Sequence, residues 1–346
     1  MPSLASDNTA PMHPAVLAAL GAVNSGHMPS YGADEVTLRL NAKLREVFAA
    51  PQLRAFPTFN GSATNGVALA AMMKPFEAVI ATRDAHIQND ECGLPEFFTG
   101  AKILIAPDHL GKLTPDGIER IVAGSKDHAP HAVRPRVISL TQSTEIGTVY
   151  SIAELQALRA VADAHDLLIH MDGARLSNAV ASLGVWPREA VTGVDILSFG
   201  GTKAGAALAE AVVIFNPALQ RDFEYWHKRM GQLPSKMRFV SAQLLALLEG
   251  DLWLELAGHA NAMAQRLEAG LAGIDGVSVL YPVEANALFV TLPPKVAKGL
   301  EAAGHKFYPW SLAGDNAYRL VCSFITTAAE VDQFLADCGS QQSPLP

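Results

Sequence analysis

The sequence predicts an α/β fold with two unequal domains, the larger one built around a mostly parallel sheet. The chain of 346 residues is too long for a single minimal core. Apolar runs typical of strands also alternate with segments of helical periodicity. Val137–Leu140 is β-rich, Ile152–Asp166 has helical spacing, and Leu167–His170 is apolar again. This order favours a βαβ unit and therefore parallel strands.

The rest of the chain continues this alternation. Val194–Phe199 and Ala211–Phe215 are strand candidates with a short glycine-rich connection, so we expect them to be antiparallel neighbours. The remaining expected elements are helices over Phe239–Leu248, Leu252–Leu271, Pro294–Ala303 and Ala328–Cys338, and strand-like runs over Val277–Leu292 and Tyr318–Ser323.

These elements divide the chain into three parts. We expect an N-terminal arm over 1–20, a large domain over 21–245 and a small C-terminal α/β domain over 246–346. The boundary falls near residue 245 because the helix over Leu252–Leu271 is long enough to connect two lobes.

Amino-acid composition and net charge make some classes of function less favourable than others. The chain is 49% hydrophobic and 17% charged, which argues against disorder and favours oligomerisation. A formal net charge of -8 argues against a nucleic-acid or anionic-membrane partner and favours a small-molecule substrate. Three widely spaced cysteines and an N-terminus without an apolar signal core point to the cytoplasm, with no membrane insertion.

A polar loop is the first candidate site. Asn60-Gly-Ser-Ala-Thr-Asn-Gly66 precedes the helix-like run Val67–Met73. Small residues at a helix N-terminus let backbone N–H groups and the Ser62 hydroxyl face an anion, and the helix dipole adds to the attraction. A plain helix cap explains such a loop equally well.

The end of a buried strand is the second candidate site. Ile169-His-Met-Asp-Gly-Ala-Arg175 carries a carboxylate, Asp172, that needs a cation or a hydrogen-bond donor if it is buried. A protonated pyridine nitrogen is one such partner. In the alternative interpretation Asp172 pairs with Arg175, and His170 is a hydrogen-bonded core histidine.

A lysine at a strand end is the third candidate. Ser198-Phe-Gly-Gly-Thr-Lys203 places Lys203 in apolar surroundings, which favours the neutral amine that attacks carbonyl groups. Lys203 follows Asp172 by 31 residues, a spacing that can put both groups at the same edge of neighbouring strands. The alternative is a lysine that caps a turn.

The order of these motifs carries a specific resemblance. The chain resembles the low-specificity L-threonine aldolases, which belong to the beta-eliminating lyase/threonine aldolase group of fold-type I pyridoxal-phosphate enzymes. The motifs that carry it are Ser6-Asp-Asn8, Tyr31-Gly, Asn60-Gly-Ser, His86 with Asp90-Glu-Cys-Gly, His170-Met-Asp-Gly-Ala-Arg175 and Phe199-Gly-Gly-Thr-Lys203, and the match continues to about Arg319.

The resemblance implies an aspartate-aminotransferase-like large domain with a seven-stranded sheet, and roles for individual residues. Lys203 would hold pyridoxal 5'-phosphate as an imine, Asp172 would keep the pyridine nitrogen protonated, and His86 would stack on the ring. The implied cofactor contacts are Gly61, Ser62, His86, Asp172, Arg175, Lys203 and Arg238. The implied substrate contacts are Ser6, Tyr31, Arg175 and Arg319, with Arg238 and Tyr31 reaching a neighbouring subunit of a homotetramer, a dimer of dimers.

One position departs from part of the family. Where many members carry Thr-His-x-Gly, this chain has Thr144-Glu-Ile-Gly147. The resemblance then implies that Glu145 stands where a histidine otherwise touches the β-hydroxyl group. The candidates for the catalytic base are His86 and Glu145, acting directly or through one water.

The sequence as a whole predicts a carbon–carbon lyase. The expected reaction is aldol cleavage of L-threonine, L-allo-threonine or phenylserine to glycine and an aldehyde. Three alternatives stay open: another pyridoxal-phosphate lyase, racemase or aminotransferase, a non-enzymatic α/β binding protein, and a metal hydrolase built on His170 and Asp172. The last lacks further clustered ligands, so we expect no metal.

Overall fold

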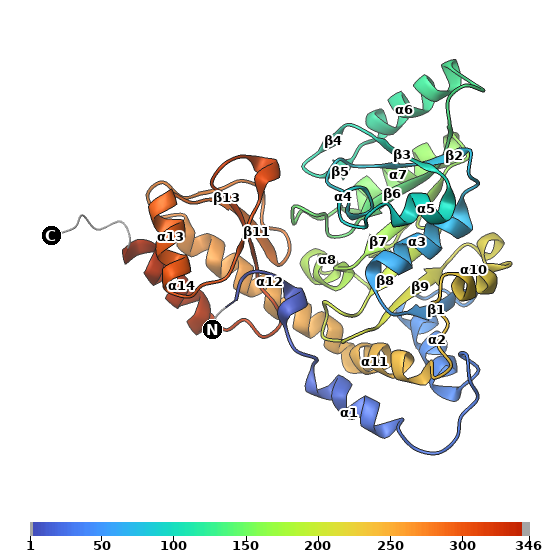
Figure 1. The fold of residues 1–346 in the computed structure, drawn as a ribbon, viewed down its shortest axis with the longest axis horizontal. Coiled ribbons are helices and arrows are strands. Elements are labelled where there is room, and N and C mark those ends of the chain that lie inside the picture. Colours follow the sequence, from blue (N-terminus) through green and yellow to red (C-terminus); the bar gives the residue numbers. More distant parts are fainter. Residues whose placement is uncertain (1–2, 341–346) are drawn as a thin grey trace.

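The chain folds around two sheets that lie in different lobes (Figure 1). The structure is a computed structural model that describes residues 3–340. The larger sheet has seven strands in the order β1-β9-β8-β7-β6-β2-β3, and the second has four in the order β10-β11-β13-β12. The α/β class that the sequence predicts, with a mostly parallel seven-stranded sheet, is confirmed.

The seven-stranded sheet is parallel except for β9. Its strands are β1 (Arg54–Thr58), β2 (Glu77–Ala81), β3 (Lys102–Ile105), β6 (Arg134–Thr141), β7 (Leu168–Gly173), β8 (Ile196–Gly200) and β9 (Glu210–Ile214). β9 runs antiparallel to both of its neighbours, β1 and β8. The expected antiparallel pairing of the strands on either side of the glycine-rich connection is therefore confirmed.

Helices cover both faces of this sheet because its strands are apolar on both faces. One face packs against α3 (Gly61–Met72) and α10 (Phe223–Arg229). The other face packs against α2 (Glu35–Val47), α6 (Pro115–Asp127), α7 (Ile152–Ala164), α8 (Leu176–Leu183) and α11 (Arg238–Leu248). Successive residues of β8 join the two cores alternately, Ile196 on the α3 side and Leu197 on the other.

The second lobe combines a small antiparallel sheet with two helices. Its strands are β10 (Ser278–Val279), β11 (Ala287–Thr291), β12 (Tyr308–Pro309) and β13 (Ala317–Val321), and its helices are α13 (Pro294–Ala302) and α14 (Ala328–Ser340). The expectation of one strand-like run over Val277–Leu292 was wrong. Residues 280–286 connect two antiparallel strands, and Pro282, which has no N–H to donate to a ladder, lies in this connection.

A long helix and the N-terminal segment connect the lobes (Figure 1). Helix α12 (Leu252–Leu271), which has the predicted bounds, contacts α8 on one side and α14 on the other. Near the N-terminus, Leu4 exchanges backbone hydrogen bonds with Lys306 and Val321 of the small lobe. Further along, α1 (Pro14–Ala22) packs against α11 beneath the large lobe.

The remaining elements are short. They are α4 (His86–Asn89), α5 (Leu94–Thr99), α9 (Pro187–Ala190), the two-residue strands β4 (Asp108–His109) and β5 (Lys112–Leu113), and the 3-10 turns η1 (Asp7–Thr9), η2 (Pro217–Leu219), η3 (Glu249–Asp251) and η4 (Ser311–Ala313). None of the helices within residues 3–340 has both the length and the apolar content that crossing a bilayer requires.

Candidate active site

The carboxyl ends of the central parallel strands bring Asp172 and Lys203 to the same edge of the sheet. Asp172, on β7, lies opposite Thr141 of β6 and Ser198 of β8. Lys203 follows three residues after the end of β8, and its charge acts on Asp172. Ligands of α/β sheets bind at this end of the strands, so this edge is the place to look for chemistry.

The turn that carries Lys203 is held tightly in place. A Cβ atom added at Gly200 would lie 2.7 Å from the backbone of Ala174, so only glycine allows β8 to end so close to the turn after β7. The carboxylate of Glu210 on β9 accepts a hydrogen bond from the Gly201 N–H at 2.9 Å. Lys203 itself is half-buried, and burial lowers its pKa. Its amine is therefore easier to deprotonate than that of an exposed lysine.

Asp172 is a buried carboxylate that stays ionised. One carboxylate oxygen accepts a hydrogen bond from Asn65 Nδ2 at 2.8 Å, and the other accepts one from the Ala174 N–H at 2.9 Å. Burial alone would raise the pKa of Asp172, but the charge of Lys203 and these hydrogen bonds outweigh it and lower the pKa. The carboxylate is thus available to a cationic partner at neutral pH.

The alternative in which Asp172 pairs with Arg175 was wrong. Arg175 donates from Nε and from its terminal nitrogen to the two carboxylate oxygens of Asp7, at 2.7 and 2.8 Å. The other half of that alternative holds, since both ring nitrogens of His170 form hydrogen bonds, to Ser139 and Ser198 at 2.9 Å each. Within residues 3–340, no group of three or more His, Cys, Asp or Glu side chains is placed to hold a metal ion.

The buried pair Asp7–Arg175 fastens the N-terminal segment over the site. Asn286, which precedes β11 of the small lobe, adds a hydrogen bond to Asp7 at 3.2 Å. Burial alone would raise the pKa of Asp7, but the charge of Arg175 outweighs it and lowers the pKa to about 2. The neighbouring Ser6 is buried, and its hydroxyl oxygen accepts a hydrogen bond from the Asn8 N–H.

Asp7→Ala is expected to lower the free energy of unfolding by about 3–5 kcal/mol, because it leaves the Arg175 guanidinium without its carboxylate partner. Urea denaturation monitored by circular dichroism measures the change. Since the pKa of Asp7 falls from 3.8 to about 2 on folding, this stabilisation is present above pH 4 and lost as the pH falls towards 2.

The matched control for Asp7 is Asp332→Ala. Asp332 forms an equally short pair with Arg266, but the two side chains are 52% and 48% exposed, so solvent screens the pair and its loss is expected to cost far less than the loss of the Asp7 pair. An equal effect of the two substitutions would contradict the buried character of the Asp7 pair.

Arg319 lies close to this pair. It projects from β13 between the rings of Tyr308 and Trp310, 5.8 Å from each ring centroid. Burial and the charge of Arg175 lower its pKa. Its Nε is buried and has no hydrogen-bond partner among the described residues. A buried guanidinium donor without a partner is suited to an incoming anion.

The two base candidates, His86 and Glu145, are also brought together. His86 begins α4, and its backbone N–H donates to the Glu145 carboxylate at 3.0 Å, while the Thr141 hydroxyl donates to the same oxygen at 2.7 Å. Burial, with the charge of Asp172, raises the pKa of Glu145 to about 7. Glu145 therefore titrates near neutral pH, where an acid–base group is most effective.

Sequence reasoning assigned no role to three residues that hold this site together. Asp7 binds Arg175, Asn65 binds Asp172, and Glu91 accepts a hydrogen bond from Asn65. Asp7 and Glu91 lie inside motifs that carried the family resemblance, and Asn65 lies in the polar loop over Asn60–Gly66. Their polar side chains within those motifs were the signal that could have pointed to them.

The phosphate-loop candidates lie at the start of α3. Asn60 caps the helix, and its side-chain oxygen accepts from the Ala63 N–H at 2.9 Å. A Cβ atom added at Gly61 would meet nothing within 4 Å, so the space beside Gly61 is open. The plain helix cap, which was the alternative interpretation of this loop, is therefore present. It does not fill the space beside Gly61, where an anion could bind.

Tyr31 and Arg238 form no hydrogen bond to Asp172 or Lys203 within the described residues. Tyr31 is 52% exposed, with the Lys228 amine 4.8 Å from its ring centroid. Arg238 begins α11, and its Nε is buried without a partner in the described part of the chain.

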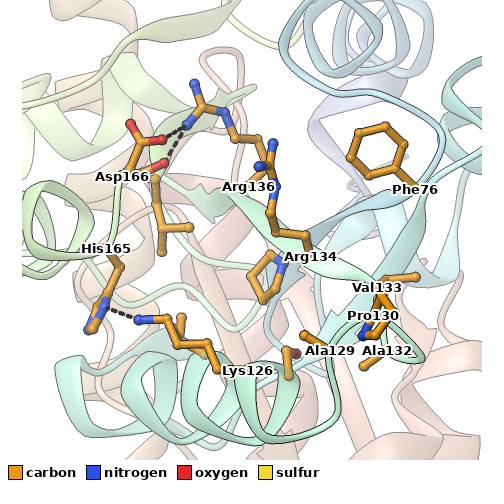
Figure 2. Close-up of a pocket in the computed structure, with 14 residues that line it drawn as sticks. Phe76, Lys126, Ala129, Pro130, Ala132, Val133, Arg134, Arg136, His165 and Asp166 are labelled. Atoms are coloured by element: carbon orange, nitrogen blue, oxygen red, sulfur yellow. Dashed lines mark hydrogen bonds and ion pairs between the residues drawn. The ribbon is translucent and has the colours of Figure 1, made fainter.

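The cavity in Figure 2 lies at the opposite edge of the sheet. It has a volume of about 500 Å³ and is lined by residues at the start of β6 and of β7. Its cationic side chains already have partners. Arg136 contacts Asp166, and Lys126 contacts His165 at 3.4 Å (Figure 2). Because it lies at the amino ends of the strands, it is separate from the Asp172–Lys203 edge.

Comparisons with known proteins agree with this geometry. The family model described as beta-eliminating lyase matches residues 3–293. Low specificity L-threonine aldolases of Pseudomonas aeruginosa and of a Pseudomonas species are 43% and 42% identical over 336 residues, covering 96% of both chains in each case. A solved threonine aldolase of Leishmania major superposes with a TM-score of 0.92 at 30% identity, covering 98% of each chain.

Proposed function

The chain belongs to the beta-eliminating lyase family, and on this premise we propose that it cleaves L-threonine, L-allo-threonine and related β-hydroxy-α-amino acids such as phenylserine to glycine and an aldehyde. One observation carries the proposal. The amine of Lys203, with its lowered pKa, and the ionised carboxylate of Asp172 lie at adjoining strand ends. The predicted family, the pyridoxal-phosphate cofactor and the lyase class are confirmed by the comparisons.

The residues at the site fit this cofactor. Pyridoxal phosphate presents a carbonyl group, a pyridine nitrogen and a phosphate dianion. We assign the first to Lys203, the second to Asp172 and the third to the start of α3 at Gly61 and Ser62. The open space beside Gly61 supports the third assignment, because a Cβ atom added there would meet nothing within 4 Å.

When bound, the cofactor supplies the electron sink that accepts the electron pair of the breaking Cα–Cβ bond. Side chains of the protein bind the substrate and transfer the protons. We propose that Arg319, whose Nε has no hydrogen-bond partner within residues 3–340, binds the substrate carboxylate, and that Arg175 adds charge while Asp7 holds it in place. A base takes the β-hydroxyl proton, and a proton is returned to Cα to give glycine.

Both base candidates are placed for proton transfer. We retain His86 and Glu145 as catalytic groups, and the hydrogen bond between the His86 N–H and the Glu145 carboxylate keeps them adjacent. Because burial holds the pKa of Glu145 near 7, its ionised fraction rises steeply across neutral pH. A rate that depends on ionised Glu145 must rise over the same interval.

Glu145→Gln is expected to lower kcat for threonine about 10²-fold while leaving the cofactor bound, because the amide cannot take a proton. Steady-state kinetics from pH 5.5 to 9 measure the effect. In the parent, kcat rises through pH 7, and in the variant this rise is lost. A variant with the turnover and pH profile of the parent would show that Glu145 has no catalytic role.

The reaction itself separates the competing functions. An aldolase forms glycine and acetaldehyde in equal amounts from threonine alone, whereas an aminotransferase needs an oxo-acid acceptor and a racemase forms neither product. A non-enzymatic binding protein would produce no glycine and would stay colourless with pyridoxal phosphate. Glycine and aldehyde assays on the purified holoenzyme, with threonine and then phenylserine, therefore test the proposal.

We also propose a homotetramer, a dimer of dimers, located in the cytoplasm. The tetramer is supported by the Nε of Arg238, which is buried without a hydrogen-bond partner in the described part of the chain, and by the exposed side chains of Tyr31 and Leu38, which line the same pocket. The division into an arm, a large domain and a small domain at residues 20 and 245 is likewise a proposal, and its terminal residues 1–2 and 341–346 lie outside the described part. Sedimentation at several concentrations tests the tetramer.

A further inference from the structure

Three hydrogen bonds connect two of the proposed catalytic groups through residues without an assigned role. His86 Nδ1 lies 2.8 Å from Glu91 Oε1. Asn65 Nδ2 donates to the same Glu91 oxygen at 2.8 Å and to Asp172 Oδ2 at 2.8 Å. The series His86–Glu91–Asn65–Asp172 therefore joins elements that are far apart in the chain, the start of α4, the middle of α3 and the end of β7.

The side chains of this series differ in burial from one end to the other. The Glu91 side chain is fully buried, while 38% of the His86 side chain is exposed. Asn65 is buried inside α3. Its amide nitrogen must face the two carboxylates, because an amide oxygen in that place would oppose two negative oxygens. Glu91 and Asn65 are therefore held in place by burial and hydrogen bonds, and the His86 imidazole is the part of the series that solvent can reach.

The chemistry of the pair determines what Glu91 does to the imidazole. A neutral histidine carries one N–H, and a carboxylate beside Nδ1 accepts a hydrogen bond from that nitrogen only if Nδ1 holds the proton. The Nε2 nitrogen then keeps its lone pair. Among the described residues, Nε2 of His86 has no hydrogen-bond partner, so it is free to act on a bound molecule.

We propose that Glu91 is a positioning residue that holds the Nδ1 proton of His86, so that Nε2 is free to accept a proton in the active site, and that Asn65 fixes Glu91 relative to Asp172. This inference rests on the proposed aldolase function and adds to it. It makes His86 a base whose tautomer is set by a buried carboxylate, with Glu145 as its backbone partner. Carboxylates that orient metal-binding histidines act in the same way.

The electrostatics of the surrounding groups agree with this geometry. The hydrogen bond to Glu91 raises the pKa of His86 against the opposing effect of burial, with further contributions from Asp172 and from Lys203, which act in opposite directions. Burial raises the pKa of Glu91 despite its hydrogen bonds to His86 and Asn65. Asn65 lets the carboxylates of Glu91 and Asp172 lie near each other by donating to both.

The tautomer can be measured in the unmodified holoenzyme. The ¹³Cδ2 chemical shift of histidine differs between the two neutral tautomers, and selectively labelled histidine in a deuterated background makes it observable in a large protein. His86→Gln assigns the signal. Above the pKa of His86, we expect the Nδ1–H tautomer. The Nε2–H tautomer would overturn the proposal, and this readout is independent of any aldolase activity.

Glu91→Gln provides the second test. We expect the pKa of His86 to fall in the ¹³C titration and kcat/KM for threonine to fall about 10- to 100-fold, as for other carboxylates that orient a histidine. Glu119→Gln, which neutralises an exposed glutamate of α6, is expected to leave both unchanged. An unchanged titration of His86 in Glu91→Gln would overturn the proposal. Failure of the aldolase function would instead appear as a parent enzyme that forms no glycine.

Discussion

Lys203→Ala is expected to reduce threonine cleavage roughly 10³-fold or more, the upper range for removal of one acid–base group, and to abolish the visible absorbance of the bound cofactor. The substitution removes the amine that attacks the cofactor carbonyl. Coupled assay of acetaldehyde and absorbance of the dialysed protein measure the two effects.

Two further variants isolate the role of the Lys203 amine. Lys203→Arg retains a positive charge next to Asp172, but a guanidinium stays protonated and cannot attack a carbonyl, so it is expected to be as inactive as the alanine variant. Lys298→Ala, on the exposed face of α13, is expected to behave like the parent. Near-parental cleavage by Lys203→Ala would refute the assignment.

Asp172→Asn is expected to lower kcat about 10²- to 10³-fold, the usual cost of removing one preorganised electrostatic group. The amide has nearly the same shape as the carboxylate but carries no charge to keep the pyridine nitrogen protonated, so the electron sink is weakened. Kinetics with threonine, together with equilibrium dialysis of pyridoxal phosphate, measure the loss of turnover and of cofactor affinity.

Measuring kcat of Asp172→Asn at several pH values provides a control for this prediction. Because the pKa of Asp172 is lowered, the parent carboxylate is ionised across the whole working range. The ratio of parent to variant kcat is therefore expected to be constant from pH 6 to 9. If kcat of Asp172→Asn were within about twofold of the parent value, Asp172 would not stabilise the transition state more than the ground state.

Local periodicity was correct for most of the elements that it identified, nearly all of them after residue 136. The bounds of α12 and the antiparallel pairing of β8 with β9 follow from helical spacing and from a short connection, and both depend only on nearby residues. The run over Val277–Leu292 failed because apolar residues continue on both sides of a connection, and periodicity alone does not show that the chain reverses there.

The side-chain contacts within the site were harder to predict from the sequence. From the sequence, Arg175 is the nearest cation to Asp172, yet its partner is Asp7, 168 residues earlier in the chain. Similarly, Asn65 reaches Asp172 across 107 residues. Such pairs depend on how α3 and the N-terminal segment pack on the sheet, and no local pattern encodes this. The motifs identified which segments matter, and the packing determined which side chains meet.

Hydride reduction of the holoenzyme followed by peptide mapping tests the central assignment most directly. Reduction makes the attachment of pyridoxal phosphate permanent, so the peptide that carries the added mass identifies the amine that held it. We expect the modification on Lys203 alone, and none in Lys203→Ala. Modification of a different lysine, or of none, would contradict the assignment of this strand end as the catalytic centre.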